Sequence, residues 1–131
     1  MTLLSTLAGD PEVEALLSDA AQLDAMLAFE RALAEASAET GWIGEAAATA
    51  IGQAIEGYEP DWFGLEAGMA QDGVVVPALV KQLKAQLPEP HRAALHKGAT
   101  SQDVVDTALM LQLARIFDVY EARLTGMLDQ L

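Results

Sequence analysis

The sequence predicts an all-α protein in which several short helices are followed by one long helix. Apolar residues such as Leu23, Met26 and Leu27 recur at the three- and four-residue spacing that places them on one helix face. Capping residues precede these apolar runs and glycines follow them. The run of valines at 74–76 could form a strand, but Pro77 favours the first turn of a helix there.

The short helices can be placed by their caps and terminators. Ser18 and Asp61 are N-cap residues that begin two helices, and Gly41 and Gly73 are placed to end the same two helices. Pro88 closes a further helix, because proline cannot continue the helical hydrogen bonding. We therefore expect short helical segments at about 18–40, 44–56, 61–73, 77–87 and 91–96.

A charged group lies on the first of these helices. We expect Glu30, Arg31 and Glu35 to form a solvated face, with Arg31 and Glu35 making an ion pair between successive turns.

The last helix differs in length and polarity. From Gln102 to Leu131 there is no proline, and no break before Gly126, which gives roughly 45 Å of helix. The segment 104–111 is apolar on nearly all sides and must therefore be buried on nearly all sides. The short helices are too few to surround it. We expect this helix to pack against a further part of the protein, against other subunits, or against both.

Composition excludes several classes of function. The chain has 131 residues, the size of one domain, and 52% of them are hydrophobic, so a packed core is expected rather than disorder. Seven basic and twenty acidic residues give a net charge of −13, which opposes binding to nucleic acids and to anionic membranes. There is no cysteine. The first ten residues lack the basic region of a signal peptide, and we expect a cytoplasmic protein without membrane spans.

One segment, at the start of the long helix, carries a candidate binding site. The first-turn N–H groups and the positive end of a helix attract anions. Gly98 allows a turn and a close approach of a ligand, and Thr100 or Ser101 provides a hydroxyl at the N-cap. His96 and Lys97 add two potential cations in an otherwise acidic chain. A carboxylate ligand fits this pattern.

The same residues also fit an ordinary helix cap. Thr100 followed three residues later by Asp103 is a common N-terminal signal that needs no ligand, and Asp106 and Thr107 would stabilise the same turn. His96 could equally be a surface residue. Spacing alone favours the cap.

A resemblance favours the binding site. The segment 96–108, His-Lys-Gly-Ala-Thr-Ser-Gln-Asp-Val-Val-Asp-Thr-Ala, resembles the first conserved block of the fumarase/aspartase superfamily. The segment 24–34 resembles the helix that opens these proteins, and the segment 76–83 is similar to the cycloisomerase branch. The resemblance implies a helical N-terminal domain at 1–98, followed at 99–131 by a substrate-binding loop and the first long helix of a central helical bundle.

This resemblance also implies a chemistry. Enzymes of the cycloisomerase branch close a lactone ring in 3-carboxy-cis,cis-muconate, giving 4-carboxymuconolactone in the β-ketoadipate pathway of aromatic degradation. The implied partner is thus a small polycarboxylate, with no cofactor and no metal. The candidate substrate-binding residues are His96, Lys97, Thr100, Ser101 and Gln102. Lys97 is included for its charge and position rather than for the resemblance.

The chain departs from the family pattern in one large respect. The family's other two conserved segments, one of which is a Gly-Ser-Ser-x-Met loop with the catalytic serine, do not occur in these 131 residues. The catalytic residues are therefore unknown, and we expect the chain alone to be inactive. Self-association through residues 102–131 is expected, because the apolar faces of residues 104–124 would otherwise be exposed. The resemblance implies a homotetramer. An adenylosuccinate lyase-like fragment and a non-enzymatic helical module remain alternatives.

Overall fold

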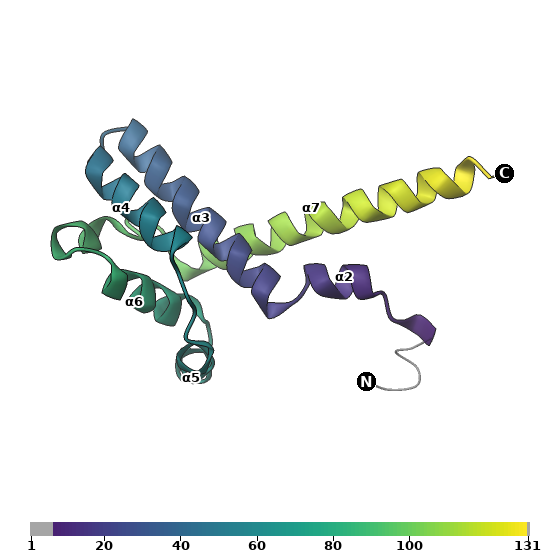
Figure 1. The fold of residues 1–131 in the computed structure, drawn as a ribbon, viewed down its shortest axis with the longest axis horizontal. Coiled ribbons are helices and arrows are strands. Elements are labelled where there is room, and N and C mark those ends of the chain that lie inside the picture. Colours follow the sequence, from purple (N-terminus) through teal and green to yellow (C-terminus); the bar gives the residue numbers. More distant parts are fainter. Residues whose placement is uncertain (1–6, 131) are drawn as a thin grey trace.

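The computed structural model describes residues 7–130 and shows only helices and connecting turns in that range. The all-α prediction is confirmed. The long helix α7 leaves a body of shorter helices and projects to one side, and α2 lies near its projecting part (Figure 1). The elements are α2 (Pro11–Leu16), α3 (Asp19–Glu39), α4 (Glu45–Glu56), α5 (Trp62–Asp72), α6 (Val76–Gln86), the 3-10 helix η1 (Glu89–Ala94) and α7 (Ser101–Leu128).

The predicted caps are confirmed. The Ser18 hydroxyl accepts from the Ala21 backbone N–H at 3.2 Å, and the Asp61 carboxylate accepts from Gly64 at 3.0 Å. Gly41 and Gly73 have φ angles of 74° and 72°, the left-handed conformation that glycine adopts most easily after a helix. These helix ends are thus determined by local chemistry that the sequence displays directly.

Two predicted details differ from the structure. Helix α2 is not among the expected helices, although Asp10 caps it, accepting from Val13 at 3.3 Å, and Pro11 stands in its first turn. Pro77 follows Val76, which is the first residue of α6, so the helix begins one residue earlier than expected. The predicted end of the last helix at Leu131 lies outside the described residues, and α7 ends at Leu128.

The core lies where α3, α4, α6 and the beginning of α7 meet. Met26 of α3, Ile51 of α4 and Leu79 of α6 are almost completely buried, with exposed fractions of 1% or less. Val104 and Ala108, in the first two turns of α7, complete this core. The packing therefore fixes the first two turns of α7 firmly on the body.

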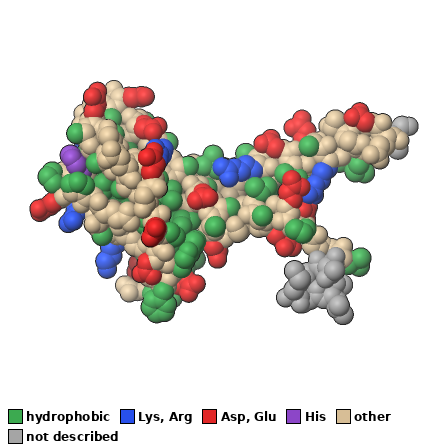
Figure 2. Space-filling view, viewed as in Figure 1, with side chains coloured by type: hydrophobic (Ala, Val, Ile, Leu, Met, Phe, Trp, Pro, Cys, Tyr) green, Lys and Arg blue, Asp and Glu red, His purple; other side chains and the backbone are tan. Residues whose placement is uncertain are grey.

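Beyond these turns, α7 is covered on one side only. Its buried residues recur at every fourth position, at Val104, Ala108, Gln112 and Ile116. Helix α2 contributes to this cover, because Gln112 Nε2 donates to the Leu16 carbonyl at 2.9 Å. Phe117, by contrast, is 62% exposed. Figure 2 shows hydrophobic side chains among acidic ones along the projecting arm. The prediction that this chain cannot surround its last helix is confirmed.

The prediction of a solvated, charged face on α3 is wrong. Arg31 does not pair with Glu35; it donates to the Glu56 carboxylate at 3.2 Å and to the Gly52 carbonyl at 3.3 Å, both on α4. Glu30 is not solvated but buried, with 1% of its surface exposed. Because α4 and the loop before α7 pack against this side of α3, tertiary partners replace the local pair.

None of the helices within residues 7–130 is both long enough and apolar enough to cross a membrane.

Candidate functional site

The candidate loop lies between η1 and α7 and is shaped by two unusual backbone angles. His96 has a φ of 59°, and Gly98 has a φ of 81°. The side chain of Leu95, just before these turns, is buried in the core. The loop is therefore anchored at Leu95, reverses its direction through His96 and Gly98, and enters α7 at Thr100.

Trp42, in the connection between α3 and α4, covers Gly98. A Cβ atom added to Gly98 would lie 2.0 Å from the nearest atom of the Trp42 ring, so only glycine fits there. The Lys97 ammonium donates to the Trp42 carbonyl at 3.0 Å and lies 5.3 Å from the centroid of the ring. The close approach predicted at Gly98 is thus made by an aromatic side chain of the same chain, and Lys97 is turned toward that side chain.

Thr100 and Asp103 form the ordinary cap that the sequence predicts. The Asp103 carboxylate accepts from the Thr100 backbone N–H at 2.8 Å and from the Thr100 hydroxyl at 3.0 Å. These hydrogen bonds hold the pKa of Asp103 below its usual range. The donors of Thr100 are therefore shared with a carboxylate that belongs to the protein.

The remaining donors lie in the first turn of α7. Its first backbone N–H groups, on Ser101 and Gln102, have no acceptor within the helix, as in any α-helix. Ser101 adds a half-buried hydroxyl. The Gln102 side chain points along the helix, donating to Asp106 at 2.5 Å. An anion at this helix start would meet the two N–H groups and the Ser101 hydroxyl first.

His96 turns inward rather than toward solvent. Its Nδ1 atom lies 2.6 Å from Oε1 of Glu30, and 18% of its side chain is exposed. The interpretation of His96 as a surface residue is therefore wrong. Burial raises the pKa of Glu30, and the hydrogen bond and charge of His96 oppose that rise. No local pattern in the sequence signals this pair, since its members are 66 positions apart.

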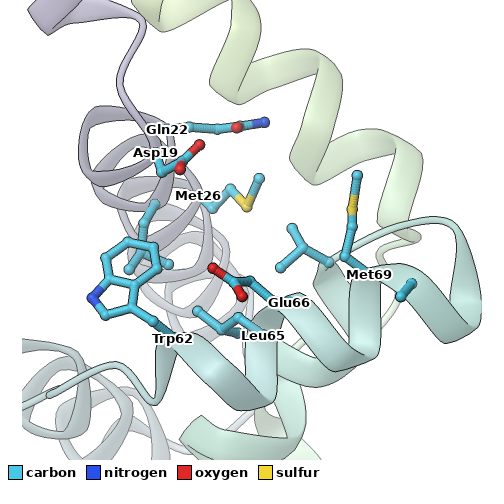
Figure 3. A pocket seen from close by; sticks show the side chains of 10 residues that line it. Asp19, Gln22, Met26, Trp62, Leu65, Glu66 and Met69 are labelled. Carbon is cyan, nitrogen blue, oxygen red and sulfur yellow. The ribbon is translucent and has the colours of Figure 1, made fainter.

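A separate cavity of about 360 Å³ lies between α3 and α5 (Figure 3). Met26 and Leu65 form part of its floor, Trp62 stands at one side, and the carboxylates of Asp19 and Glu66 project into it. None of the candidate loop residues lines it. Two carboxylates would repel a polycarboxylate, so the charge of this cavity is wrong for the expected ligand.

Another hollow, of about 420 Å³, is lined by Trp42, His91 and Lys97 among others. Within residues 7–130 no group of three or more His, Asp or Glu side chains is arranged to hold a metal ion. The chemistry available at the loop is thus anion binding by backbone and hydroxyl donors, beside an imidazole held by a buried carboxylate.

Comparison with known sequences gives a consistent result. The chain is 38% identical over 125 residues to 3-carboxy-cis,cis-muconate cycloisomerase from Pseudomonas putida; the match covers 92% of this chain and 29% of that enzyme. It is 40% identical over 116 residues to nitrosuccinate lyase from Streptomyces davaonensis, covering 86% and 24%. Adenylosuccinate lyase from Synechocystis is a weaker match, 34% identical over 110 residues, covering 83% and 24%. No family model matches the chain.

Comparison with solved structures agrees with the comparison of sequences. The solved structure of the 3-carboxy-cis,cis-muconate lactonizing enzyme from Pseudomonas putida superposes with a TM-score of 0.78 at 38% identity, over 86% of this chain and 26% of that one. The expected resemblance to the cycloisomerase branch is confirmed in sequence and in fold. The chain spans less than a third of the length of these relatives.

Proposed function

We infer that this chain is part of a 3-carboxy-cis,cis-muconate cycloisomerase of the fumarase/aspartase superfamily. It shares sequence and fold with 29% and 26% of the length of the two enzymes compared. The proposed reaction is the lactonisation of 3-carboxy-cis,cis-muconate to 4-carboxymuconolactone, in the β-ketoadipate pathway. Residues 1–98 would form the helical N-terminal domain, and residues 99–131 the substrate-binding loop and the start of a central bundle helix. A cytoplasmic location stays a prediction from the sequence.

The observation that carries this proposal is the start of α7, where donors gather in the segment that most resembles the family. A substrate with three carboxylates needs donors that are fixed before it arrives. We propose that the N–H groups of Ser101 and Gln102 and the Ser101 hydroxyl bind one substrate carboxylate. Thr100 would contribute its hydroxyl proton in exchange for the hydroxyl bond to Asp103, while its backbone N–H stays on that carboxylate.

Two further loop residues have different proposed roles. His96 would stand beside the bound carboxylate, and its charge would favour binding when the ring is protonated. Lys97 donates to Trp42 in this structure, so we propose that it supports the loop and acts on the substrate only through its charge at long range.

We propose that the chain alone does not complete the reaction. The family's catalytic serine belongs to a segment with no counterpart in these 131 residues. The exposed apolar residues of α7 support assembly with further helices, because large apolar patches are rare on monomers. A homotetramer, as the family forms, is the proposed assembly.

An assay of the protein expressed from the complete natural reading frame tests the reaction. Loss of the ultraviolet absorbance of 3-carboxy-cis,cis-muconate would support the cycloisomerase, and turnover of adenylosuccinate alone would support the related lyase instead. Turnover of neither, with a folded protein, would leave the non-enzymatic module as the better description.

The loop can be tested on this chain directly. Propane-1,2,3-tricarboxylate, titrated into the ¹⁵N-labelled chain, should shift the backbone amide signals of Ser101 and Gln102, with a dissociation constant on the order of 1 mM for a part of a site. Shifts spread evenly over the surface, or none at all, would contradict the proposed binding site. A double variant of Ser101→Ala and Thr100→Ala should weaken the shifts.

A further inference from the structure

The proposed function leaves one buried ionisable group unexplained, namely Glu30 in the middle of α3. Its exposed fraction is 1%, and Oε1 lies 2.6 Å from His96 Nδ1. Its other oxygen, Oε2, is buried and has no hydrogen-bond partner among the described residues. A carboxylate buried in this way is costly unless a partner compensates it. The imidazole of His96 is that partner.

The backbone of His96 is also held at a cost. Among the non-glycine residues within 7–130, His96 alone has a positive φ angle, at 59°. Such conformations persist where the surrounding structure enforces them, and they occur often at functional sites. Leu95, buried on the N-terminal side, and Gly98, covered by Trp42, enforce it here. The result is an imidazole that points at α3 from the loop that begins α7.

The contact sets the tautomer of the ring when Glu30 is ionised. An ionised carboxylate only accepts hydrogen bonds, so Nδ1 must carry a proton to donate to Glu30. The other nitrogen, Nε2, is then the one that gains or loses the second proton. Two further charged groups act on the pair, Lys84 from α6 on Glu30 and Asp103 from α7 on His96.

We propose that Glu30 is a positioning residue, which keeps the Nδ1 proton on His96 and thereby leaves Nε2 as the atom that serves a ligand carboxylate at the start of α7. When Nε2 is protonated, the ring donates to Glu30 through one nitrogen and to the ligand through the other. The role toward the ligand rests on the proposed function of the loop; the tautomer rests on the contact between Glu30 and His96 with Glu30 ionised. A protein of this kind would therefore bind its substrate through a histidine fixed from α3.

Nitrogen NMR tests the tautomer directly. The chain has two histidines, so long-range ¹H–¹⁵N spectra resolve both rings, and a His91→Gln variant assigns them. In the unaltered chain at high pH, His96 should show a protonated Nδ1 and an unprotonated Nε2. In Glu30→Gln the side-chain amide can donate to Nδ1, so the population should shift toward the Nε2-protonated tautomer. Glu35→Gln, the same change of charge on an exposed site of α3, should leave the spectrum unaltered.

Binding then tests the role of the pair. Glu30→Gln should bind propane-1,2,3-tricarboxylate at least fivefold more weakly, and Glu35→Gln should not. Circular dichroism checks that each variant is folded. An Nε2-protonated tautomer in the unaltered chain would overturn the proposal without any variant, even if Glu30→Gln fails to fold. The amide oxygen introduced by Glu30→Gln can still accept from Nδ1, so in this folded variant a shifted tautomer with an unchanged affinity would also overturn the proposal. Failure of the unaltered chain to bind the tricarboxylate would refute the loop's proposed function, while the tautomer would still decide the assignment of Glu30.

Discussion

The indole of Trp42 lies against the Cα atom of Gly98, at a distance that leaves no room for a side chain at position 98. The contact joins the connection between α3 and α4 to the loop before α7. Gly98 also has a φ of 81°, which a residue with a Cβ atom adopts only at a cost. Two independent requirements thus demand glycine at this position.

Replacing Gly98 by alanine should therefore destabilise the chain by about 2 kcal/mol, from backbone strain and from the contact with Trp42. Urea denaturation followed by circular dichroism measures this change. Gly126→Ala is the matched control, because a Cβ atom added there would have no neighbour within 4 Å and alanine favours a helix. This control should raise stability by up to about 1 kcal/mol.

The two causes can be separated with a double variant. If the ring causes part of the cost, Gly98→Ala should destabilise a Trp42→Ala background less than it destabilises the unaltered chain. Equal costs in the two backgrounds would assign the whole effect to the backbone angle, and would contradict the steric role of Trp42.

His96→Ala should be costly because it leaves the Glu30 carboxylate buried without its partner. Removing one member of a buried pair costs about 3 kcal/mol or more. His91→Ala, which removes a half-buried imidazole outside this pair, is the control and should cost about 1 kcal/mol or less. A cost for His96→Ala as small as that of the control would contradict the structural role of the pair.

The pH dependence of this variant has a defined sign. Burial raises the pKa of Glu30, and His96→Ala removes the group that opposes that rise. A carboxyl with a raised pKa in the folded state stabilises the fold below its ordinary pKa and loses that contribution as the pH rises. The stability of His96→Ala relative to the unaltered chain should therefore fall as the pH rises from the ordinary glutamate value, 4.5, toward neutrality. A difference that is constant across this range would contradict the assignment.

The sequence predicts those parts of the fold that depend on neighbouring residues. Ser18, Asp61 and Gly73 determine their helix ends through bonds within one turn, so their roles could be inferred without a structure. The same local signal, Asp10 followed by Pro11, is present for α2 and could have identified that helix.

Contacts between distant segments could not be inferred in this way. An i,i+4 rule pairs Arg31 with Glu35, but α4 offers Arg31 a carboxylate and a carbonyl on the neighbouring helix. Of the candidate site, the sequence predicts the Thr100 cap and the helix start. The engagement of His96 by Glu30 and of Lys97 by Trp42 depends on how α3 packs against the loop.

Helix α2 is tied to α7 by charge. Arg123 contacts the carboxylates of Asp10 and Glu12, with its Nη2 atom 3.0 Å from Asp10 Oδ1 and 2.6 Å from Glu12 Oε2. This contact lowers the pKa of Asp10 to about 2. A lowered carboxyl pKa contributes stability above the ordinary value, which is lost as the pH falls toward 2.

Arg123→Gln should consequently lower the melting temperature at neutral pH and lose most of this effect as the pH falls to about 2. The effect should also shrink in molar salt, because the pair is exposed and therefore screened. Melting curves of both proteins over this pH range test the prediction. Arg115→Gln on the same helix is a control for the loss of one positive charge. A difference in melting temperature that is undiminished at the acid end of the range would contradict the ion pair.

The exposed apolar residues of α7 predict self-association. Phe117, Tyr120, Leu124 and Met127 are 43–64% exposed and are spaced by three, four and three positions, as in a seam between packed helices. The double variant Phe117→Gln and Leu124→Gln should therefore shift the chain toward monomer in sedimentation velocity at micromolar concentration. Glu121→Gln, an exposed change between them, should not. A monomeric unaltered chain would contradict the prediction.

Asp103 gives the sharpest test of the loop, because its carboxylate uses the same Thr100 donors that a bound anion would use. If the loop binds a substrate carboxylate, Asp103 is a competing like charge. Asp103→Asn should then bind propane-1,2,3-tricarboxylate about fivefold more tightly at low salt, the effect of one unit charge about 4 Å away in water. Asp106→Asn removes the same charge one turn further along α7 and should have a smaller effect. Weaker binding by folded Asp103→Asn would show instead that the cap shapes the site, and that its order outweighs the repulsion between the two carboxylates.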